Sequence, residues 1–250
     1  MSGRRPFSAV ILAAGLGKRM GSDLPKVLHR ALNRPLLIHV LDQITPLEPE
    51  RIVVVVGHRA SLVRQALADH EVRFAEQAPQ LGTGHALQMA WPALEGGPET
   101  ILVVAGDMPL IRMATLGHLL DRHEREGNGV TFLSGRLEDP AGYGRVIRDG
   151  SGDFVKIVEE KDATSTERAV AEVNSGIYCF EREPLRLALG FLRADNRQQE
   201  YYLTDTLSII RSRGGRIGVE LVADPRELNG VNTPEQLEMV EETLRAFGET

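Results

Sequence analysis

The sequence passes from SAVIL at residues 8–12 straight into the glycine-rich AAGLGKRM at residues 13–20. The first run carries no charge, and runs of this kind form strands that helices cover on both faces of a parallel sheet. The small residues that follow allow backbone N–H groups to approach a phosphate, and Lys18 and Arg19 add positive charge. The segment predicts a strand that ends at an anion-binding turn, although a plain strand-to-helix turn fits the glycines equally well.

Strand-like and helix-like segments alternate through the rest of the first half. Short β-branched runs predict further strands at residues 52–56, 72–76 and 101–105, and the first and last of these are almost wholly apolar. Amphipathic segments predict helices over residues 35–44, 61–69, 84–91 and 113–126. This alternation predicts a Rossmann-like α/β fold, with a doubly wound, mostly parallel sheet that binds ligands at the carboxyl ends of its strands.

The second half has a different pattern, with strands, loops and little helix. It predicts strands at residues 130–137, 145–148, 154–158 and 173–180, followed by a helix over about 201–213, a strand at 216–222 and a final helix from about 234. The four strands suggest a mixed or antiparallel extension beside the parallel core. We expect one domain over residues 1–250, with a first lobe over about 1–128, an inserted lobe over about 129–232 and a C-terminal helix over about 233–250.

Composition disfavours several classes of protein. The formal net charge of −6 argues against binding to nucleic acid or to anionic membranes, but not against small anionic substrates. Cys179 is the only cysteine, so no intrachain disulfide can form, and its apolar neighbours predict a buried strand residue. The seven histidines are scattered, without an HExxH or CxxC zinc pattern. Without a signal peptide or a membrane span, we expect a cytoplasmic protein.

Two familiar phosphate-binding loops do not match the glycine-rich turn. A dinucleotide-binding fingerprint requires a third glycine where Met20 stands, which disfavours an NAD-dependent oxidoreductase. A P-loop requires serine or threonine after Gly-Lys, and Arg19 stands there. Lys26 follows a rigid proline in Leu24-Pro25-Lys26. A single lysine is usually solvated, but Arg19 and Lys26 on either side of one glycine-rich turn suit a triphosphate.

The longer stretch LAAGLGKRMGSDLPKVLH, residues 12–29, resembles the signature of sugar-phosphate nucleotidyltransferases. Further motifs follow in the order and at the spacing of that family: QLGTGHA (80–86), GDMPL (106–110), GYGR (142–145), IVEEKDA (157–163), EVNSGIY (172–178), EYYLTD (200–205) and GVN (230–232). Within the family, the chain is most similar to the uridylyltransferase domain of the bifunctional bacterial N-acetylglucosamine-1-phosphate enzymes. The resemblance implies a nucleotide-diphospho-sugar transferase fold and Mg²⁺-dependent transfer of UMP from UTP to N-acetylglucosamine 1-phosphate.

A nucleotide site is implied around the first and third predicted strands. The Gln77 amide can donate and accept, which suits the edge of uracil, and Gly82 permits close backbone approach. From the residues alone, Gln77 could be a solvated loop residue and Thr83 a helix N-cap. The resemblance implies that the nucleotide is bound by Leu12, Ala13, Ala14, Gly15, Lys26, Gln77, Gly82 and Thr83. It also implies catalytic roles for Arg19 and Lys26.

A metal site is implied where the most apolar strand ends. Asp107 follows that strand, and Mg²⁺ favours hard oxygen ligands, of which the protein usually supplies one or two. The resemblance implies Asn232 as the second ligand, through its amide oxygen. From the residues alone, Asp107 could instead cap the following turn, and Asn232 could cap the final helix.

Residues of the second lobe supply the groups that bind a sugar, namely a carboxylate acceptor, an amide that both donates and accepts, and a glycine N–H. The resemblance implies a sugar site formed by Gly106, Gly144, Glu159 and Asn174. The charged run at residues 159–162 could instead be a solvated turn. The helix that EYYLTD opens could close over the sugar, or Tyr201 or Tyr202 could belong to the core.

Two departures from the family pattern concern selectivity. Lys18 stands where the family often has threonine, and Ala105 stands where close relatives often carry tyrosine. Ala105 therefore leaves open which nucleotide and which acceptor phosphate are preferred. No segment up to Thr250 matches the hexapeptide-repeat acetyltransferase region of the bifunctional enzymes, so a stand-alone enzyme and part of a longer one are both open. The remaining alternatives are a nucleotidyltransferase with another substrate pair and a non-catalytic nucleotide-sugar sensor; the oligomeric state is not predicted.

Overall fold

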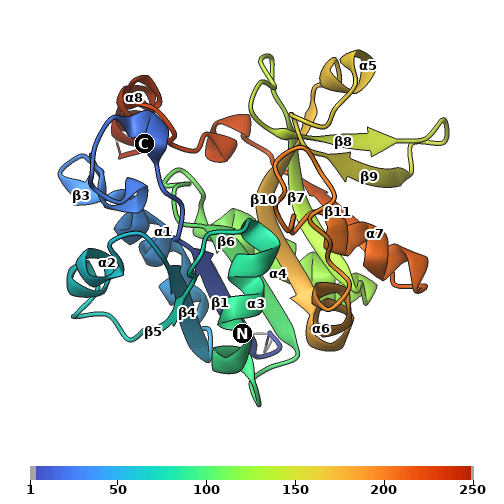
Figure 1. The fold of residues 1–250 in the computed structure, drawn as a ribbon, viewed down its shortest axis with the longest axis horizontal. Helices are drawn as coiled ribbons and strands as arrows, with labels where there is room; N and C mark the ends of the chain where they lie inside the picture. Colours follow the sequence, from blue (N-terminus) through green and yellow to red (C-terminus); the bar gives the residue numbers. More distant parts are fainter. Residues whose placement is uncertain (1–3, 249–250) are drawn as a thin grey trace.

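The fold is built on one nine-stranded sheet in a computed structural model that describes residues 4–248 (Figure 1). The strands are β1 (Phe7–Leu12), β4 (Arg51–Val56), β5 (Arg73–Glu76), β6 (Thr100–Ala105), β7 (Val130–Arg136), β8 (Gly144–Arg148), β9 (Phe154–Val158), β10 (Glu172–Glu181) and β11 (Ile217–Leu221). A separate hairpin joins β2 (Arg30–Ala31) to β3 (Arg34–Pro35).

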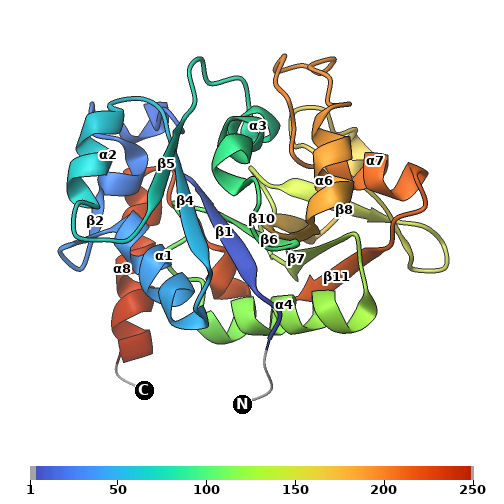
Figure 2. The ribbon, with the colours of Figure 1, turned by 90° about the horizontal axis from the view of Figure 1, so that it is seen from below.

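Helices cover both faces of this sheet, as Figure 2 shows. The α-helices are α1 (Leu36–Ile44), α2 (Ala60–Ala66), α3 (Thr83–Leu94), α4 (Met113–Glu126), α5 (Ser165–Arg168), α6 (Arg182–Leu189), α7 (Asp205–Ser212) and α8 (Pro234–Gly248). Short 3-10 helices are η1 (Lys18–Met20), η2 (Lys26–Leu28), η3 (Thr45–Leu47) and η4 (Pro225–Leu228). One apolar cluster joins α1, α2 and α4 to the sheet, and a second joins α3, α6 and α7 to its opposite face.

The strand order confirms the predicted fold class. Along the path β11-β7-β10-β6-β1-β4-β5, the pairs β11–β7, β6–β1, β1–β4 and β4–β5 are parallel. Only β10 runs against its neighbours, β6 and β7. The hairpin β8–β9 lies off this path and pairs with the start of β10. A mostly parallel α/β sheet thus carries a mixed and antiparallel extension.

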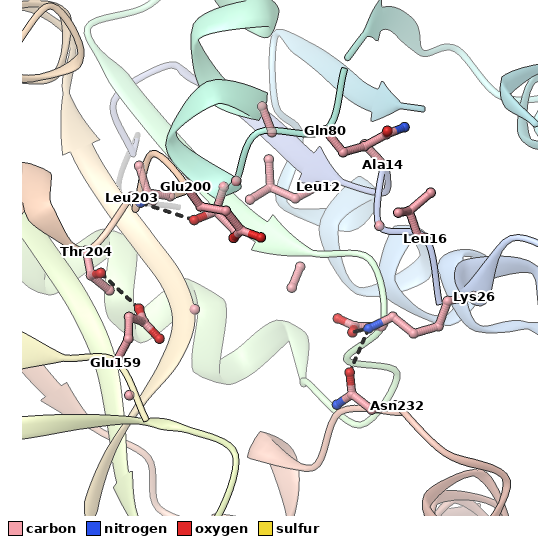
Figure 3. A pocket seen from close by; sticks show the side chains of 18 of the residues that line it. Leu12, Ala14, Leu16, Lys26, Gln80, Glu159, Glu200, Leu203, Thr204 and Asn232 are labelled. Carbon is pink, nitrogen blue, oxygen red and sulfur yellow. Dashed lines mark hydrogen bonds and ion pairs between the residues drawn. The ribbon is translucent and has the colours of Figure 1, made fainter. Parts of the chain in front are cut away.

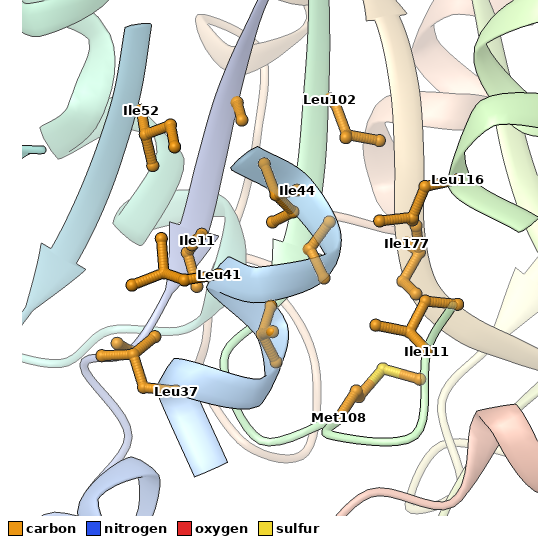
Figure 4. Close-up of a cluster of buried hydrophobic side chains, with 14 of the residues drawn as sticks. Ile11, Leu37, Leu41, Ile44, Ile52, Leu102, Met108, Ile111, Leu116 and Ile177 are labelled. Atoms are coloured by element: carbon orange, nitrogen blue, oxygen red, sulfur yellow. The ribbon is translucent and has the colours of Figure 1, made fainter. Parts of the chain in front are cut away.

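The first strand lies in the middle of the sheet because both of its faces are apolar. Ala9, Val10 and Ile11 are fully buried. Ala9 and Ile11 face the cluster with α1, while Val10 faces the opposite cluster. Figure 4 shows Ile11 against Leu41 of α1, so the glycine-rich turn that follows β1 starts from a strand packed on both faces.

A bulge in β10 divides the sheet. Tyr178 to Glu181 pair with β6, whereas Val173 and Asn174 pair with β8. The register with β7 shifts between Asn174 and Tyr178, and Gly176 there has a positive φ of 81°. Only glycine adopts such a conformation readily. The strand therefore changes partner at the bulge, and β6 and β8 diverge on either side of it.

Three local predictions were wrong. The sequence predicted no helix between residues 180 and 201, but the helix α6 forms there. Its residue Pro184 lies in the first turn, where proline is tolerated. The helix predicted from residue 201 begins only at Asp205, because residues 201–203 bond to another loop instead. The helix predicted to end at Trp91 continues past Pro92 to Leu94.

Two further features bear on the sequence-based expectations. Cys179 is fully buried in β10, as predicted, and burial raises the pKa of its thiol well above the usual range. Within residues 4–248, no helix combines the length and the apolar character that crossing a bilayer requires.

Candidate active site

One cleft of about 650 Å³ lies along the carboxyl ends of β1 and β6 and beside the bulge of β10 (Figure 3). It brings together thirteen of the predicted site residues: Leu12, Ala14, Gly15, Arg19, Lys26, Gln77, Gly82, Thr83, Asp107, Gly144, Glu159, Asn174 and Asn232. These residues come from both predicted lobes and span more than 200 positions of the chain. The position agrees with the rule that open α/β sheets bind ligands where the strand order reverses.

Ala13 and Gly106 do not reach the lining of this cleft. The Ala13 N–H donates to Val55 O at 2.9 Å, and the Gly106 N–H donates to Leu12 O at 2.9 Å. A Cβ atom on Gly106 would lie 3.2 Å from both Leu12 O and Val27 Cγ1. The structure places both residues in the wall behind the cleft, where they hold the ends of neighbouring strands together.

The glycine-rich loop is shaped for close approach. Gly17 has a φ of 60°, and a Cβ atom there would come within 2.9 Å of Lys26 Cβ. Within residues 4–248, the N–H groups of Gly15 and Leu16 make no hydrogen bond. Arg19 is exposed on η1 and lines the cleft. The loop thus presents free donors and a cation, which suits an anionic ligand.

Lys26 joins the two residues predicted to bind metal. Its Nζ forms an ion pair with Asp107 Oδ2. The same atom donates a hydrogen bond to Asn232 Oδ1 at 2.9 Å, as Figure 3 shows. Both members of the ion pair are mostly buried, with side chains 15% and 18% exposed. One cationic atom therefore lies between the two oxygens, and Lys26 is not the solvated lysine that the alternative reading required.

The backbone places Asn232 beside Asp107. The Val231 N–H donates to Asp107 O at 2.9 Å. The Asn232 N–H donates to Gln236 Oε1 at 2.8 Å, and Thr233 Oγ1 accepts from the Gln236 N–H. Thr233, rather than Asn232, therefore caps the first turn of α8, which leaves the Asn232 side chain available to the cleft.

Gln77 is buried and held in one orientation. Its Nε2 donates to Gly82 O at 2.9 Å, and its backbone N–H donates to Val56 O at 2.8 Å. Its side-chain amide also lies 3.2 Å from His85 Nδ1. Gln77 is therefore not a solvated loop residue. The amide lies in the wall of the cleft, where a heterocyclic base edge can meet it.

A second segment, residues 200–204, lies across residues 81–84, and the sequence alone gave no sign of this contact. The Tyr201 N–H donates to Leu81 O at 2.8 Å, and the Gly84 N–H donates to Tyr201 O at 2.7 Å. The Leu203 N–H donates to Thr83 Oγ1 at 3.1 Å. Thr83 is consequently the first residue of α3 and does not act as its N-cap.

The opposite end of the cleft is polar. Thr204 Oγ1 donates to Glu159 Oε1 at 2.9 Å (Figure 3). Burial raises the pKa of the Glu159 carboxyl, and the nearby acidic groups Asp205, Asp162 and Glu200 raise it further. A Cβ atom on Gly144 would lie 3.5 Å from Glu159 Oε2. The first of the acidic residues at 159–162 thus faces the cleft.

Asn174 lies within β10, in the strand predicted from the sequence. Its Nδ2 donates to Tyr178 Oη at 2.7 Å, and its Oδ1 accepts from the Gly176 N–H at 3.3 Å. The bulge that divides the sheet therefore also orients the Asn174 amide. Tyr178 Oη belongs to the same polar end, and burial raises the pKa of its phenol well above the usual range.

The charged run at residues 159–162 is not a solvated turn. Glu160 forms an ion pair with the buried Arg145 at 2.7 Å. Asp162 accepts from the Arg197 N–H and from Tyr202 Oη. Lys161 alone is exposed. Tyr202 is buried, and burial raises its pKa to about 12, so of the two tyrosines this one belongs to the packed interior.

Comparison with known proteins agrees with this geometry. Residues 9–168 match the family model described as the MobA-like NTP transferase domain. The fold and the cleft thus define a nucleotidyltransferase. The chain belongs to the MobA-like NTP transferase family, which confirms the resemblance to nucleotidyltransferases seen in the sequence.

Similar proteins carry the name bifunctional protein GlmU. The chain is 48% identical over 239 residues to that of Caldanaerobacter subterraneus subsp. tengcongensis, covering 95% of this chain and 51% of the relative. It is 52% identical over 239 residues to that of Cupriavidus taiwanensis, covering 94% of this chain and 51% of the relative. The chain spans about half the length of the curated relatives it matches.

A solved structure with the same fold is a putative glucose-1-phosphate thymidylyltransferase from Bacillus anthracis, in complex with sucrose. The TM-score is 0.75, with 96% of this chain and 95% of that chain covered. At 17% sequence identity, the likeness establishes the fold alone.

The contact between residues 81–84 and 200–204 can be tested at Gly82. Its φ is 105°, and a Cβ atom there would lie 2.7 Å from Tyr201 O. Gly82→Ala should therefore lower the free energy of unfolding by about 1–3 kcal/mol. It should also speed amide hydrogen exchange at Gly84 and Tyr201 by at least about tenfold, because both amides lose their acceptors.

Gly152→Ala is the matched control. Gly152 has a φ of 86° but no atom within 4 Å of its Cβ position, so the substitution carries the backbone cost without the collision. Equal losses of stability and unchanged exchange at Gly84 in the two variants would mean that the close packing at Gly82 does not hold the segments together.

Proposed function

We propose that the protein transfers UMP from UTP to N-acetylglucosamine 1-phosphate and releases pyrophosphate. The observation that carries the proposal is a single cleft with cations and free backbone donors at one end and a polar pocket at the other. Family membership supports nucleotidyl transfer, and the motifs shared with sugar-phosphate nucleotidyltransferases support this substrate pair. We further propose that residues 1–128 bind mainly the nucleotide and residues 129–232 mainly the sugar.

The nucleotide lies in this proposal along the ends of β1 and β5. Gln77 and the Gly82 backbone meet the uracil edge, since the Gln77 amide is already oriented by its bond to Gly82 O. The free N–H groups of Gly15 and Leu16 donate to the phosphates. Arg19 and Lys26 offset the negative charge of the triphosphate and of the pyrophosphate that leaves.

The reaction requires little acid–base chemistry from the protein. A sugar phosphate has a second pKa of about 6, so its oxygen is largely deprotonated at pH 7. That oxygen attacks the α-phosphorus, the new P–O bond forms, and the bond to the oxygen bridging the α- and β-phosphates breaks. The tasks left to the chain are to align the two substrates and to neutralise charge, which suits a cleft without a nucleophilic serine or cysteine arrangement.

The residues present fit a divalent cation. Asp107 and Asn232 already direct one oxygen each toward a single cationic atom, Lys26 Nζ. Mg²⁺ needs only one or two protein oxygens when phosphates and water complete its shell. In the described part of the chain, no group of three or more His, Cys, Asp or Glu residues could hold a metal by itself. When bound at Asp107 and Asn232, Mg²⁺ would neutralise phosphate charge.

The sugar occupies in this proposal the end formed by Gly144, Glu159 and Asn174. Glu159 offers a hydrogen-bond acceptor, and Asn174 offers an amide that both donates and accepts. Gly144 leaves space for the sugar to approach the backbone closely. Such a pocket rejects an analogue that leaves its buried polar groups unpaired, with ratios of up to about 10⁴. Ala105 also lines the cleft, and its small side chain leaves room for other acceptors.

A substrate panel tests the proposal. With Mg²⁺ and UTP, we expect pyrophosphate release to show a higher kcat/KM for N-acetylglucosamine 1-phosphate than for glucose 1-phosphate or glucosamine 1-phosphate. Asp107→Ala should lower turnover by about 10²–10³ while the protein stays folded, which is the scale of a lost electrostatic contribution. Equal kcat/KM for the three acceptors rejects the sugar assignment, and no pyrophosphate release with any pair favours a nucleotide-sugar sensor.

The position of Lys26 predicts how the protein binds metal on its own. A divalent cation at Asp107 and Asn232 has to displace the Lys26 ammonium. Lys26→Met should therefore tighten Mn²⁺ binding to the nucleotide-free protein by about tenfold, which corresponds to about 1.4 kcal/mol. Electron paramagnetic resonance of free Mn²⁺ measures this affinity without any turnover.

Arg19→Met is the control, because Arg19 is a cation of the same cleft without a contact to either oxygen. Asp107→Ala should remove the binding. Equal Mn²⁺ affinities in Lys26→Met and Arg19→Met would show that the ammonium does not compete for the cation position.

Glu159 predicts a pH dependence that is independent of catalysis. Because the pKa of its carboxyl is raised in the folded protein, the charged form weakens the fold above the unfolded-state pKa. Glu159→Gln should be more stable than the wild type at pH 8, and the difference should shrink as the pH falls through the raised pKa. Urea denaturation over this range measures it, and a difference that stays constant with pH contradicts the assignment.

A further inference from the structure

Arg145 is a charged residue with no access to solvent and no access to the cleft. Its side chain is only 2% exposed and is the largest of the fully buried side chains in the described part of the chain. The neighbouring Gly144 lines the cleft, whereas Arg145 does not. A buried charge costs several kcal/mol unless it is paired, and a well-packed apolar residue often serves stability as well. Arg145 therefore calls for an explanation beyond packing.

The guanidinium of Arg145 connects three segments. Its Nη2 forms an ion pair with Glu160 Oε2 at 2.7 Å. Its Nη1 donates to Tyr143 O, and its Nε donates to Arg168 O at 3.3 Å, at the end of α5. Within residues 4–248, Glu160 Oε2 has no partner other than this ion pair. Loss of Arg145 would leave a carboxylate oxygen buried and unpaired.

Gly144, Glu159 and Asn174 are each one step along the chain from Arg145 or from one of its contacts. Gly144 precedes Arg145, and Glu159 precedes Glu160. Val173, which precedes Asn174, pairs with Arg145 across the β8–β10 ladder. Glu159 bonds Thr204 at the cleft while Glu160 bonds Arg145 behind it, so the two side chains hold the turn from opposite sides.

We infer that Arg145 is a positioning residue for the sugar: through Glu160 and the β8–β10 ladder it sets the placement of Glu159, Gly144 and Asn174. The inference rests on the proposed function, because it assumes that these three residues contact the sugar. None of the contacts of Arg145 named above lies at the nucleotide end of the cleft. Changing Arg145 should therefore weaken recognition of the sugar and leave recognition of the nucleotide intact.

The test uses calorimetry to measure the affinity for UDP-N-acetylglucosamine divided by the affinity for UDP. This ratio isolates the contribution of the sugar without turnover. In Arg145→Met we expect this ratio to fall at least about tenfold while the Kd of UDP stays within about twofold; misplacement by an ångström at a site costs up to about 10². In turnover, KM for the sugar phosphate should rise by a similar factor and KM for UTP should not.

Arg148→Met is the matched control. Arg148 lies on the same strand, and its Nε and Nη2 each pair with Glu172 at 2.7 Å, but neither residue lines the cleft. This variant should lose stability without a change in the affinity ratio. Glu160→Ala removes the carboxylate that pairs with Arg145. Because the Glu160 side chain is 35% exposed, this variant should fold, and it keeps the test decisive if Arg145→Met does not.

The outcomes separate the two claims. If the wild type prefers UDP-N-acetylglucosamine to UDP, and Arg145→Met and Glu160→Ala keep that preference, the positioning role is wrong and the proposed function stands. A loss of UDP affinity equal to the loss of sugar affinity also overturns it, since that is what general loosening of the structure produces. If the wild type shows no preference, the sugar assignment itself fails, and the positioning role fails with it.

Discussion

The contact of Lys26 with Asp107 and Asn232 is the interaction on which the arrangement of the cleft depends. Lys26 lies in η2 after β1, Asp107 follows β6, and Asn232 precedes α8. They meet because β1 and β6 are parallel neighbours whose carboxyl ends lie together. A partly buried carboxylate is unfavourable unless a cation neutralises it. Lys26 supplies that charge from within the chain, so the glycine-rich loop, the end of β6 and the segment before α8 are drawn to one point.

The parts of this arrangement that follow from local chemistry were predictable. The apolar run of β1 and the amphipathic helix α4 show their place in the fold in residue type and spacing alone, and the same pattern places Asp107 just after β6. Relations between distant backbone segments were not. Nothing in EYYLTD indicates that Tyr201 and Leu203 bond to residues 81–84, and a helical pattern there was overridden by that contact. The bulge at Gly176 was likewise hidden, because it depends on β6 and β8 sharing one edge of β10.

The polar end of the cleft and the residues behind it include charged groups whose burial lowers the stability of the fold. Glu159 carries a carboxyl whose charged form burial disfavours, and Arg145 is charged and almost completely enclosed. Both depend on partners, Thr204 for Glu159 and Glu160 for Arg145. Local features that lower stability and persist only because their surroundings hold them are typical of functional sites. In the sequence, Glu159 and Glu160 fit a solvated charged turn as well as a sugar site, since the energetic cost of these charges appears only when their burial is known.

The bond between Lys26 and Asn232 joins residues that are 206 positions apart. During synthesis at about 5–20 residues per second, the ribosome adds Asn232 about 10–40 seconds after Lys26. The first four parallel strands can pair during that interval, yet Asp107 and Lys26 meet without their amide partner. A growing chain is thus able to pair these four strands well before the contact of Lys26 with Asp107 and Asn232 is complete.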